Sequence, residues 1–199
     1  MVEPGIYFSN NFSVTAWVNI LSHNNHQRLI DFGNGENKNN FIIALSSGTT
    51  GYPYVAIHNV NRTDCISPQA LPLSTWTFIA VTFKNLTLSI YIDGVKVIDC
   101  IVEVPENVIR SICYIGKSHW NVDSTTSAAI DELKIFDWAL NFEELLLAGN
   151  IKYFPIHYWS FNQNARDVTA NIDVQDEMNT EFITDKNGNS NSATYLNFG

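Results

Sequence analysis

The sequence predicts an all-β fold, a sandwich of two antiparallel sheets with one short helix. Apolar and polar residues alternate over short runs, which is the period of a half-buried strand. Turn-forming clusters of Gly, Asn and Asp recur about every 8–12 residues, a spacing typical of sandwiches rather than of alternating strands and helices. The 199 residues are 45% hydrophobic and 16% charged, which is enough apolar mass for a folded core.

The strands are expected in order along the first two-thirds of the chain. The clearest alternation lies in residues 12–20, where Phe12, Val14 and Val18 share the face expected to point into the core. The dipeptide Asp93-Gly94 predicts a tight hairpin turn, because Gly accepts a positive φ without penalty. Strands are expected at residues 12–20, 28–32, 41–46, 54–59, 75–83, 86–92, 95–104 and 130–136, and Trp17, Trp76, Trp138 and Trp159 are expected in the core from their positions in or beside strands.

The last third of the chain contains one expected helix and a polar tail. The helix is expected near residues 141–148, because Asn141 occupies the N-cap position, Glu144 stands in the first turn and Gly149 closes the segment. The composition changes beyond Ile151. The tail holds two strand-like segments, 153–161 and 193–198, and between them a polar stretch, 162–192, that is expected to be a long surface loop or a linker.

The charge balance disfavours several partners. Lys and Arg number 11 and Asp and Glu number 20, so the formal net charge is −9. An acidic surface repels phosphate groups, so binding to nucleic acid or to an anionic membrane is not expected. No apolar run reaches the roughly 18 residues that span a bilayer, and the first four residues lack the basic-then-apolar layout of a signal peptide.

The three cysteines favour one disulfide and one buried free thiol, with three free thiols as the alternative. A bond between Cys65 and Cys100 is feasible if their strands are neighbours, and it requires Cα atoms about 4.4–6.8 Å apart. Cys113 is then expected to be the buried thiol. Neither a Cys-x-x-Cys pair nor a His at ligand spacing indicates zinc.

Three N-x-S/T sequons make Asn11, Asn61 and Asn85 candidate glycosylation sites. Asn85 fits best, because it lies in an expected turn between two strands, where an acceptor is exposed. The sequons point to an extracellular setting.

Six short motifs occur in order along residues 6–149. They are F-S-V-T-A-W-V at 12–18, L-I-D-F-G at 29–33, W-T-F-I-A-V-T-F at 76–83, L-S-I-Y-I-D-G-V at 88–95, Y-I-G-K at 114–117 and I-D-E-L-K-I-F at 130–136, the last leading into the expected helix. In this order and spacing they resemble the laminin G-like and pentraxin-like domains of the concanavalin A-like family. The resemblance implies a two-sheet antiparallel jelly-roll sandwich.

The tail resembles the opening strands of such a domain. The block H-Y-W-S-F-N at 157–162 and the strand-like segment at 193–198 would precede residue 12 in the family rather than follow the helix. Either the chain is a slice of a tandem array, or it is a circularly permuted domain whose tail supplies its own first strands. We expect residues 151–199 to fold back and complete the sandwich formed by residues 1–150, because an open apolar sheet edge favours aggregation.

The resemblance also implies a calcium site. Domains of this family often bind Ca²⁺ through carboxylate and carbonyl oxygens, which suit a hard cation. Asp131 with Asn162 or Asp167 is the candidate for a structural site, provided that the tail folds back. The alternative is that Asp131 caps backbone amides or faces solvent. The pentraxin-type site is not expected, because Asn39-Asn40 and Ser118-His119-Trp120 stand where that site needs acids.

A ligand-binding loop is the second implication of the resemblance. The loop that contains His119 and Trp120 often borders ligand sites in the family, so Trp120 is the candidate for stacking on a sugar ring, with His119 beside it. The alternative is that Trp120 packs under its own loop.

Catalysis is not expected. Glycosidases need two carboxylates placed as acid and as nucleophile or base. Asp131 and Glu132 are adjacent residues of a strand, so their side chains are expected on opposite faces and not at one substrate bond. No other arrangement of Ser, Cys, His or acids suggests a catalytic site.

The function implied by the resemblance is non-catalytic recognition of glycan or protein ligands by an extracellular or cell-surface module. Calcium is a candidate cofactor, and the module is expected to belong to a larger multidomain chain. One alternative is a purely architectural repeat of a large adhesion protein. The other is a glycoside hydrolase relative that lacks a recognisable catalytic pair.

Overall fold

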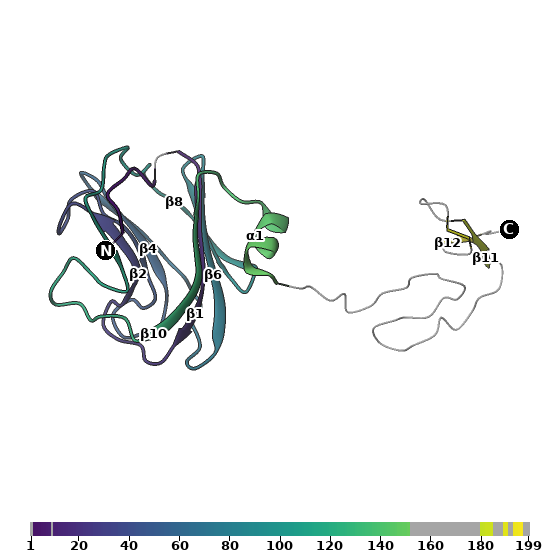
Figure 1. The fold of residues 1–199 in the computed structure, drawn as a ribbon, viewed down its shortest axis with the longest axis horizontal. Coiled ribbons are helices and arrows are strands. Elements are labelled where there is room, and N and C mark those ends of the chain that lie inside the picture. Colours follow the sequence, from purple (N-terminus) through teal and green to yellow (C-terminus); the bar gives the residue numbers. More distant parts are fainter. Residues whose placement is uncertain (1, 9, 152–179, 185–188, 191–192, 197–199) are drawn as a thin grey trace. The chain divides into compact units, whose positions relative to one another are not determined.

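Two five-stranded antiparallel sheets form the body of the protein (Figure 1). The computed structural model describes residues 2–8, 10–151, 180–184, 189–190 and 193–196, which belong to two units, Met1–Ile151 and Lys152–Gly199. The first sheet has the order β10-β1-β6-β7-β8, and the second sheet has the order β5-β4-β3-β2-β9. Their strands are β1 (Phe12–Ile20), β2 (Arg28–Gly33), β3 (Phe41–Ala44), β4 (Tyr54–His58), β5 (Arg62–Ile66), β6 (Trp76–Lys84), β7 (Thr87–Ile92), β8 (Val95–Ile101), β9 (Ile112–Ile115) and β10 (Ala128–Phe136).

The core lies between the two sheets, as the alternation in the sequence predicts. Phe12, Val14, Ala16 and Val18 of β1 are buried in one cluster with residues of the second sheet such as Phe41. Burial of apolar side chains stabilises the sandwich by about 25 cal/mol for each Å² removed from water. The predicted all-β sandwich is therefore confirmed.

Two tight turns set the register of the first sheet. Asp93 and Gly94, with φ of 50° and 78°, join β7 to β8 as the sequence predicts. Asn85 and Leu86, with φ of 50° and 67°, join β6 to β7. Positive φ at both central residues matches the twist of the flanking strands, which is why such turns favour Asn, Asp and Gly.

The helix α1 (Phe142–Gly149) covers part of the outer face of the first sheet. Asn141 is its N-cap and forms a reciprocal capping box with Glu144, as expected for this pair of residues. The left-handed residue at the end is Asn150, with φ of 50°, one position after the Gly149 that the sequence suggests. Leu145 is fully buried against Phe78 and Ala80 of β6, so the helix is fixed to the sheet.

A disulfide links one edge of each sheet. Cys65 on β5 and Cys100 on β8 are bonded, with their Cα atoms 5.7 Å apart, and Cys113 is free and buried. The predicted pairing and the predicted buried thiol are both confirmed. At the opposite side of the sandwich, β10 and β9 are the edge strands, and within the described residues β10 has a strand partner on one side only, which is β1.

The prediction that the tryptophans are core residues is wrong for two of them. Trp76 is 46% exposed and Trp138 is 47% exposed, whereas Trp17 is half-buried. Trp76 is the first residue of β6, beyond the part of the outer face that α1 covers. Trp138 follows β10, and its ring lies edge-on to Phe136, at 5.2 Å between ring centroids. Trp159 lies outside the described residues.

The second unit contains one described pair of antiparallel strands, β11 (Thr180–Ile183) and β12 (Ala193–Leu196). The strand-like character expected for residues 193–198 is thus found in β12. The expectation that residues 151–199 complete the sandwich stays a prediction, and its key segment, residues 157–161, lies outside the described residues.

Candidate functional site

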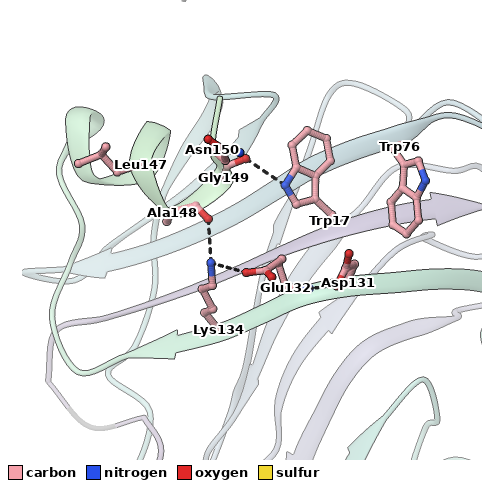
Figure 2. A pocket seen from close by; sticks show the side chains of 9 residues that line it. All are labelled: Trp17, Trp76, Asp131, Glu132, Lys134, Leu147, Ala148, Gly149 and Asn150. Atoms are coloured by element: carbon pink, nitrogen blue, oxygen red, sulfur yellow. Dashed lines mark hydrogen bonds and ion pairs between the residues drawn. The ribbon is translucent and has the colours of Figure 1, made fainter. Parts of the chain in front are cut away.

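A pocket of about 540 Å³ lies on the outer face of the first sheet, where β10 meets the end of α1 (Figure 2). Its volume falls in the range of about 300–1,000 Å³ that is usual for small-ligand sites. It is lined by Trp17, Trp76, Asp131, Glu132, Lys134, Leu147, Ala148, Gly149 and Asn150. We call it the tryptophan pocket.

A β-bulge in β10 brings both acids to this pocket. Trp17 pairs with Asp131 and Thr15 pairs with Lys134, so β10 has one residue more than β1 in this interval. Glu132 takes a left-handed conformation, with φ of 51°, which turns the strand locally. The expectation that Asp131 and Glu132 occupy opposite faces is therefore wrong, because the bulge breaks the two-residue period of the strand.

The charged side chains of the pocket are held by short contacts. Lys134 Nζ lies 2.6 Å from a carboxylate oxygen of Glu132 and donates to the carbonyl of Ala148 at 3.1 Å. The amide of Glu132 donates to Asp131 Oδ1 at 2.8 Å. Asp131 thus caps a backbone amide, and both carboxylates keep oxygen atoms directed to a pocket that they line.

The two tryptophans play different parts. Trp17 donates its indole N–H to the carbonyl of Gly149 at 3.1 Å and packs on Phe78, at 5.6 Å between ring centroids, so its ring is fixed. The fit is close, because a Cβ added at Gly149 would lie 2.9 Å from the Phe78 ring. The Trp76 side chain makes no hydrogen bond with the described residues, and Trp76 remains 46% exposed. Its ring and its N–H are free for a ligand.

The candidate calcium ligands are only partly described. Asp131 lies in the tryptophan pocket, whereas Asn162 and Asp167 lie outside the described residues. No group of three or more His, Cys, Asp or Glu residues in the described part of the chain could hold a metal ion. Ca²⁺ takes about 6–8 oxygen ligands, so Asp131 and Glu132 alone do not form its site.

The structure places His119 and Trp120 in the loop between β9 and β10, which packs on the second sheet, whereas the tryptophan pocket lies on the first sheet. Trp120 is half-buried, packs on the outer face of the second sheet and lines a separate small pocket. The His119 side chain is 3% exposed, and its Nδ1 lies 2.8 Å from Asp31 Oδ1. Asn40 also binds Asp31, at 2.9 Å, so two of the positions compared with the pentraxin-type site contribute to an internal hydrogen-bond network.

The candidate glycosylation sites are accessible. Asn11, Asn61 and Asn85 are all exposed. Asn85 occupies the tight turn between β6 and β7, as expected.

The arrangement of the tryptophan pocket suits a sugar. An exposed indole offers an apolar ring face and one polar N–H, which matches the flat apolar face and the hydroxyls of a pyranose. Carboxylates accept hydrogen bonds from hydroxyls, and the ammonium of Lys134 donates to them. The sequence points to Asp131 for a different reason, as a calcium ligand, and does not point to Trp17, Trp76, Glu132 and Lys134 as members of a ligand site. The signal in the sequence is the spacing of Ile130 and Leu133, both packed on the core three positions apart.

Comparison with known proteins agrees with this architecture. A family model described as the concanavalin A-like lectin/glucanase superfamily matches residues 3–146. A search of curated proteins finds no match.

Among solved structures, domain 4 of a GH43 extracellular arabinanase from Geobacillus stearothermophilus, solved with arabinotriose, matches at 22% identity with a TM-score of 0.62, over 74% of this chain and 70% of that chain. The receptor-binding domain of botulinum neurotoxin mosaic serotype C/D matches at 19% identity with a TM-score of 0.53, over 72% of this chain and 37% of that domain's chain. The binding domain of paraclostridial mosquitocidal protein 1 matches at 17% identity with a TM-score of 0.53, over 74% and 38%. At these identities the likeness shows a shared fold.

Proposed function

The chain belongs to the concanavalin A-like lectin/glucanase superfamily, and we propose that its sandwich is a non-catalytic module that binds a glycan in the tryptophan pocket. The observation that carries this proposal is the exposed ring of Trp76 beside the carboxylates of Asp131 and Glu132. One relative by fold was solved with arabinotriose and others are receptor-binding domains, which supports a carbohydrate-binding role without naming the ligand.

The strained backbone at Glu132 supports the same site. A residue other than Gly in the left-handed region costs of order 1–3 kcal/mol, and such residues persist where the surroundings enforce them and often where function needs them. Here the strain turns two neighbouring carboxylates toward one pocket. A flat β10 would present one of them elsewhere.

The pocket has room for more than one sugar ring. Its volume of about 540 Å³ and its open position between β10 and α1 suit a short oligosaccharide that runs past Trp76. The exposed Leu147 adds an apolar contact on the helix side. We therefore expect binding to an oligosaccharide to exceed binding to its single sugar.

An extracellular setting fits the module. A disulfide is stable in oxidising compartments and the three sequons are exposed, as glycosylation requires. Within the described residues, no helix is long and apolar enough to cross a membrane. We propose that the chain acts outside the cell or at its surface, as part of a larger protein.

The test is a glycan array probed with the full chain and with two matched variants, Trp76→Ala and Trp138→Ala. Both tryptophans are exposed to nearly the same extent, 46% and 47%, but only Trp76 lines the pocket. We expect at least one oligosaccharide to bind, and to be lost only in Trp76→Ala. Equal loss in both variants, or no bound glycan, contradicts the proposal and favours an architectural role.

Two further arms address calcium and catalysis. Binding that disappears with a chelator and returns with Ca²⁺ would support a calcium site at Asp131, completed by residues beyond those described. Hydrolysis of a bound β-glucan that is lost in Asp131→Asn or Glu132→Gln would make the protein a glycosidase and contradict the non-catalytic proposal.

A further inference from the structure

A second pocket, of about 110 Å³, lies on the outer face of the second sheet. It is lined by His26, Arg28, Tyr54, His58, Arg62, Trp120 and Asp123. We call it the arginine pocket. The loop that closes it is anchored from below, since the His119 amide donates to Asp31 Oδ2 at 3.0 Å and Asp31 is fully buried. Trp120 is thereby held against the sheet as one wall.

The floor of this pocket is a buried guanidinium. Arg28 is 4% exposed, donates from Nη1 to the Tyr54 hydroxyl, and donates from Nη2 to Asp123 Oδ2 at 2.6 Å. Its carbon Cζ lies 5.8 Å from the centre of the Trp120 ring. A buried ion pair adds little net stability compared with well-packed apolar residues. The main effect of this network is therefore to hold the hydrogen-bonding groups of the pocket in fixed orientations, and its contribution to the stability of the fold is small.

The histidine at the rim is oriented as a donor. His26 Nδ1 accepts from the Gly48 amide at 3.2 Å and lies 3.2 Å from the Tyr54 hydroxyl, so the ring proton is assigned to Nε2. Nε2 makes no hydrogen bond with the described residues. His26 also takes a left-handed conformation, with φ of 48°, and its ring packs edge-on against the Tyr54 ring, at 5.9 Å between centroids.

The arginine pocket contains both an acceptor and a donor that have no partner among the described residues. Asp123 Oδ2 accepts from Arg28 and from the Ser118 hydroxyl, at 2.6 and 2.8 Å, while Oδ1 has no partner among the described residues. Arg62 at the rim pairs through Nε with Asp64 at 2.7 Å and also hydrogen-bonds with Tyr54, so it is already engaged within the pocket. A ligand that fits must donate to Asp123 and accept from His26.

The charges argue against an anionic ligand. Arg28 and Arg62 are outnumbered by Asp31, Asp64 and Asp123, and burial lowers the pKa of both His26 and His58, which keeps them neutral near pH 7. The pocket requires a ligand that both donates and accepts hydrogen bonds and that has an apolar face for the indole. A sugar ring with two neighbouring hydroxyls meets these requirements. The small volume admits one ring and not a chain.

We infer that the arginine pocket binds a single uncharged sugar ring at the end of a glycan, with Trp120 as its wall, Asp123 Oδ1 as the acceptor and His26 Nε2 as the donor. This site lies on the sheet opposite the tryptophan pocket, so it goes beyond the proposed function and stands or fails separately from it. A module with both sites would contact one branched glycan or two neighbouring glycans.

The test is a ¹H–¹⁵N titration of the full chain with single sugars, read at the indole N–H signals of Trp120 and Trp76. The panel consists of D-glucose, D-galactose, D-mannose, L-fucose and L-arabinose, with N-acetylneuraminic acid as the anionic probe. We expect at least one neutral sugar to shift the Trp120 signal in the wild type and equally in Trp76→Ala.

Two variants keep this test sharp. Trp120→Ala removes the wall of the pocket. His26→Asn deletes the Nε2 donor but keeps a polar atom near the position of Nδ1, and Asn tolerates the left-handed conformation. We expect each variant to weaken binding at least tenfold. Because Trp120→Ala has lost the indole signal, its binding is followed through the backbone amide signals of the other pocket residues. His26→Asn should keep the wild-type spectrum outside the pocket.

Three results would overturn the inference. They are no shift of the Trp120 signal with any neutral sugar, a shift with N-acetylneuraminic acid alone, and undiminished binding by a folded His26→Asn. Loss of oligosaccharide binding in Trp76→Ala concerns the tryptophan pocket only, so the failure of one site is distinguishable from the failure of the other.

Discussion

Trp17 on β1 lies directly opposite Asp131 on β10, and this pair marks the end of a bulge that shapes the tryptophan pocket. Two positions back along β1, Thr15 faces Lys134, so Glu132 and Leu133 together face the single residue Ala16. The bulge keeps Leu133 on the core while Asp131 and Glu132 both reach the pocket. One extra residue in an edge strand thus creates a candidate binding site on an otherwise regular sheet surface.

Glu132→Gly should separate stability from binding. Gly adopts a positive φ without strain, so we expect the free energy of unfolding to rise by about 1 kcal/mol, while affinity for an array glycan falls because a carboxylate is lost. Chemical denaturation and a binding titration measure the two effects. Glu132→Gln, which keeps the side chain length and the strain, is the control. A Glu132→Gly variant that is less stable and binds normally would contradict this account of the bulge.

The thiols should react in a fixed order. We expect a thiol reagent to find no reactive cysteine in the folded protein, one after denaturation and three after denaturation with reduction, because Cys65 and Cys100 are bonded and Cys113 is buried. Burial also raises the pKa of the Cys113 thiol, which lowers the fraction of reactive thiolate. Three reactive thiols, rather than one, in the denatured and unreduced chain would show that the disulfide is absent.

Removing the disulfide should weaken the sandwich. The bond joins the edge strands β5 and β8 of the two sheets and spans a separation of 35 residues. We expect Cys65→Ser with Cys100→Ser to lower the free energy of unfolding by about 2–4 kcal/mol. Denaturation by urea measures this, with Cys113→Ser as the single-thiol comparison. Unchanged stability in the double variant would show that the bond does not constrain the chain.

Stability should fall as the pH drops from 7.5 to 5.0. Burial lowers the pKa of His26 and His58 below the ordinary value of 6.5, and Arg62 lowers that of His58 further. The unfolded chain therefore binds protons at a higher pH than the folded chain does, so stability is lost as pH falls through 6.5 toward the folded values. Thermal unfolding at the two pH values measures this. His58→Gln should flatten the profile, and a Tm that is equal or higher at pH 5.0 in the wild type contradicts the prediction.

The fold and its faces could be read from the sequence where local chemistry decides them. The alternation of β1, the Asp93-Gly94 turn and the Asn141 cap all depend on residues whose preferences are strong and local. The Cys65–Cys100 pairing is not local, and from the sequence it is feasible only on the condition that the two strands are neighbours. The site could not be read in the same way. The exposure of Trp76 depends on where α1 stops covering the sheet, which is a tertiary property.

The bulge left a weaker trace in the sequence. Ile130, Leu133 and Ile135 all pack on the core, and the three-residue step between the first two is incompatible with a regular strand. The same break places Asp131 beside Glu132 in the pocket. The arginine pocket gives an even weaker signal in the sequence, because Arg28 and Asp123 are 95 residues apart in sequence and meet only in the folded chain.

The most direct test of the central claim is an equilibrium titration of the best array oligosaccharide into the wild type, Trp76→Ala and Trp138→Ala. Loss of a stacked ring should remove roughly 1.4 kcal/mol or more of binding free energy, which is a tenfold rise in Kd. We predict a rise of at least tenfold for Trp76→Ala and a change of less than about twofold for Trp138→Ala, since only the former lines the pocket. Equal Kd values for the wild type and Trp76→Ala would contradict a glycan site at the tryptophan pocket.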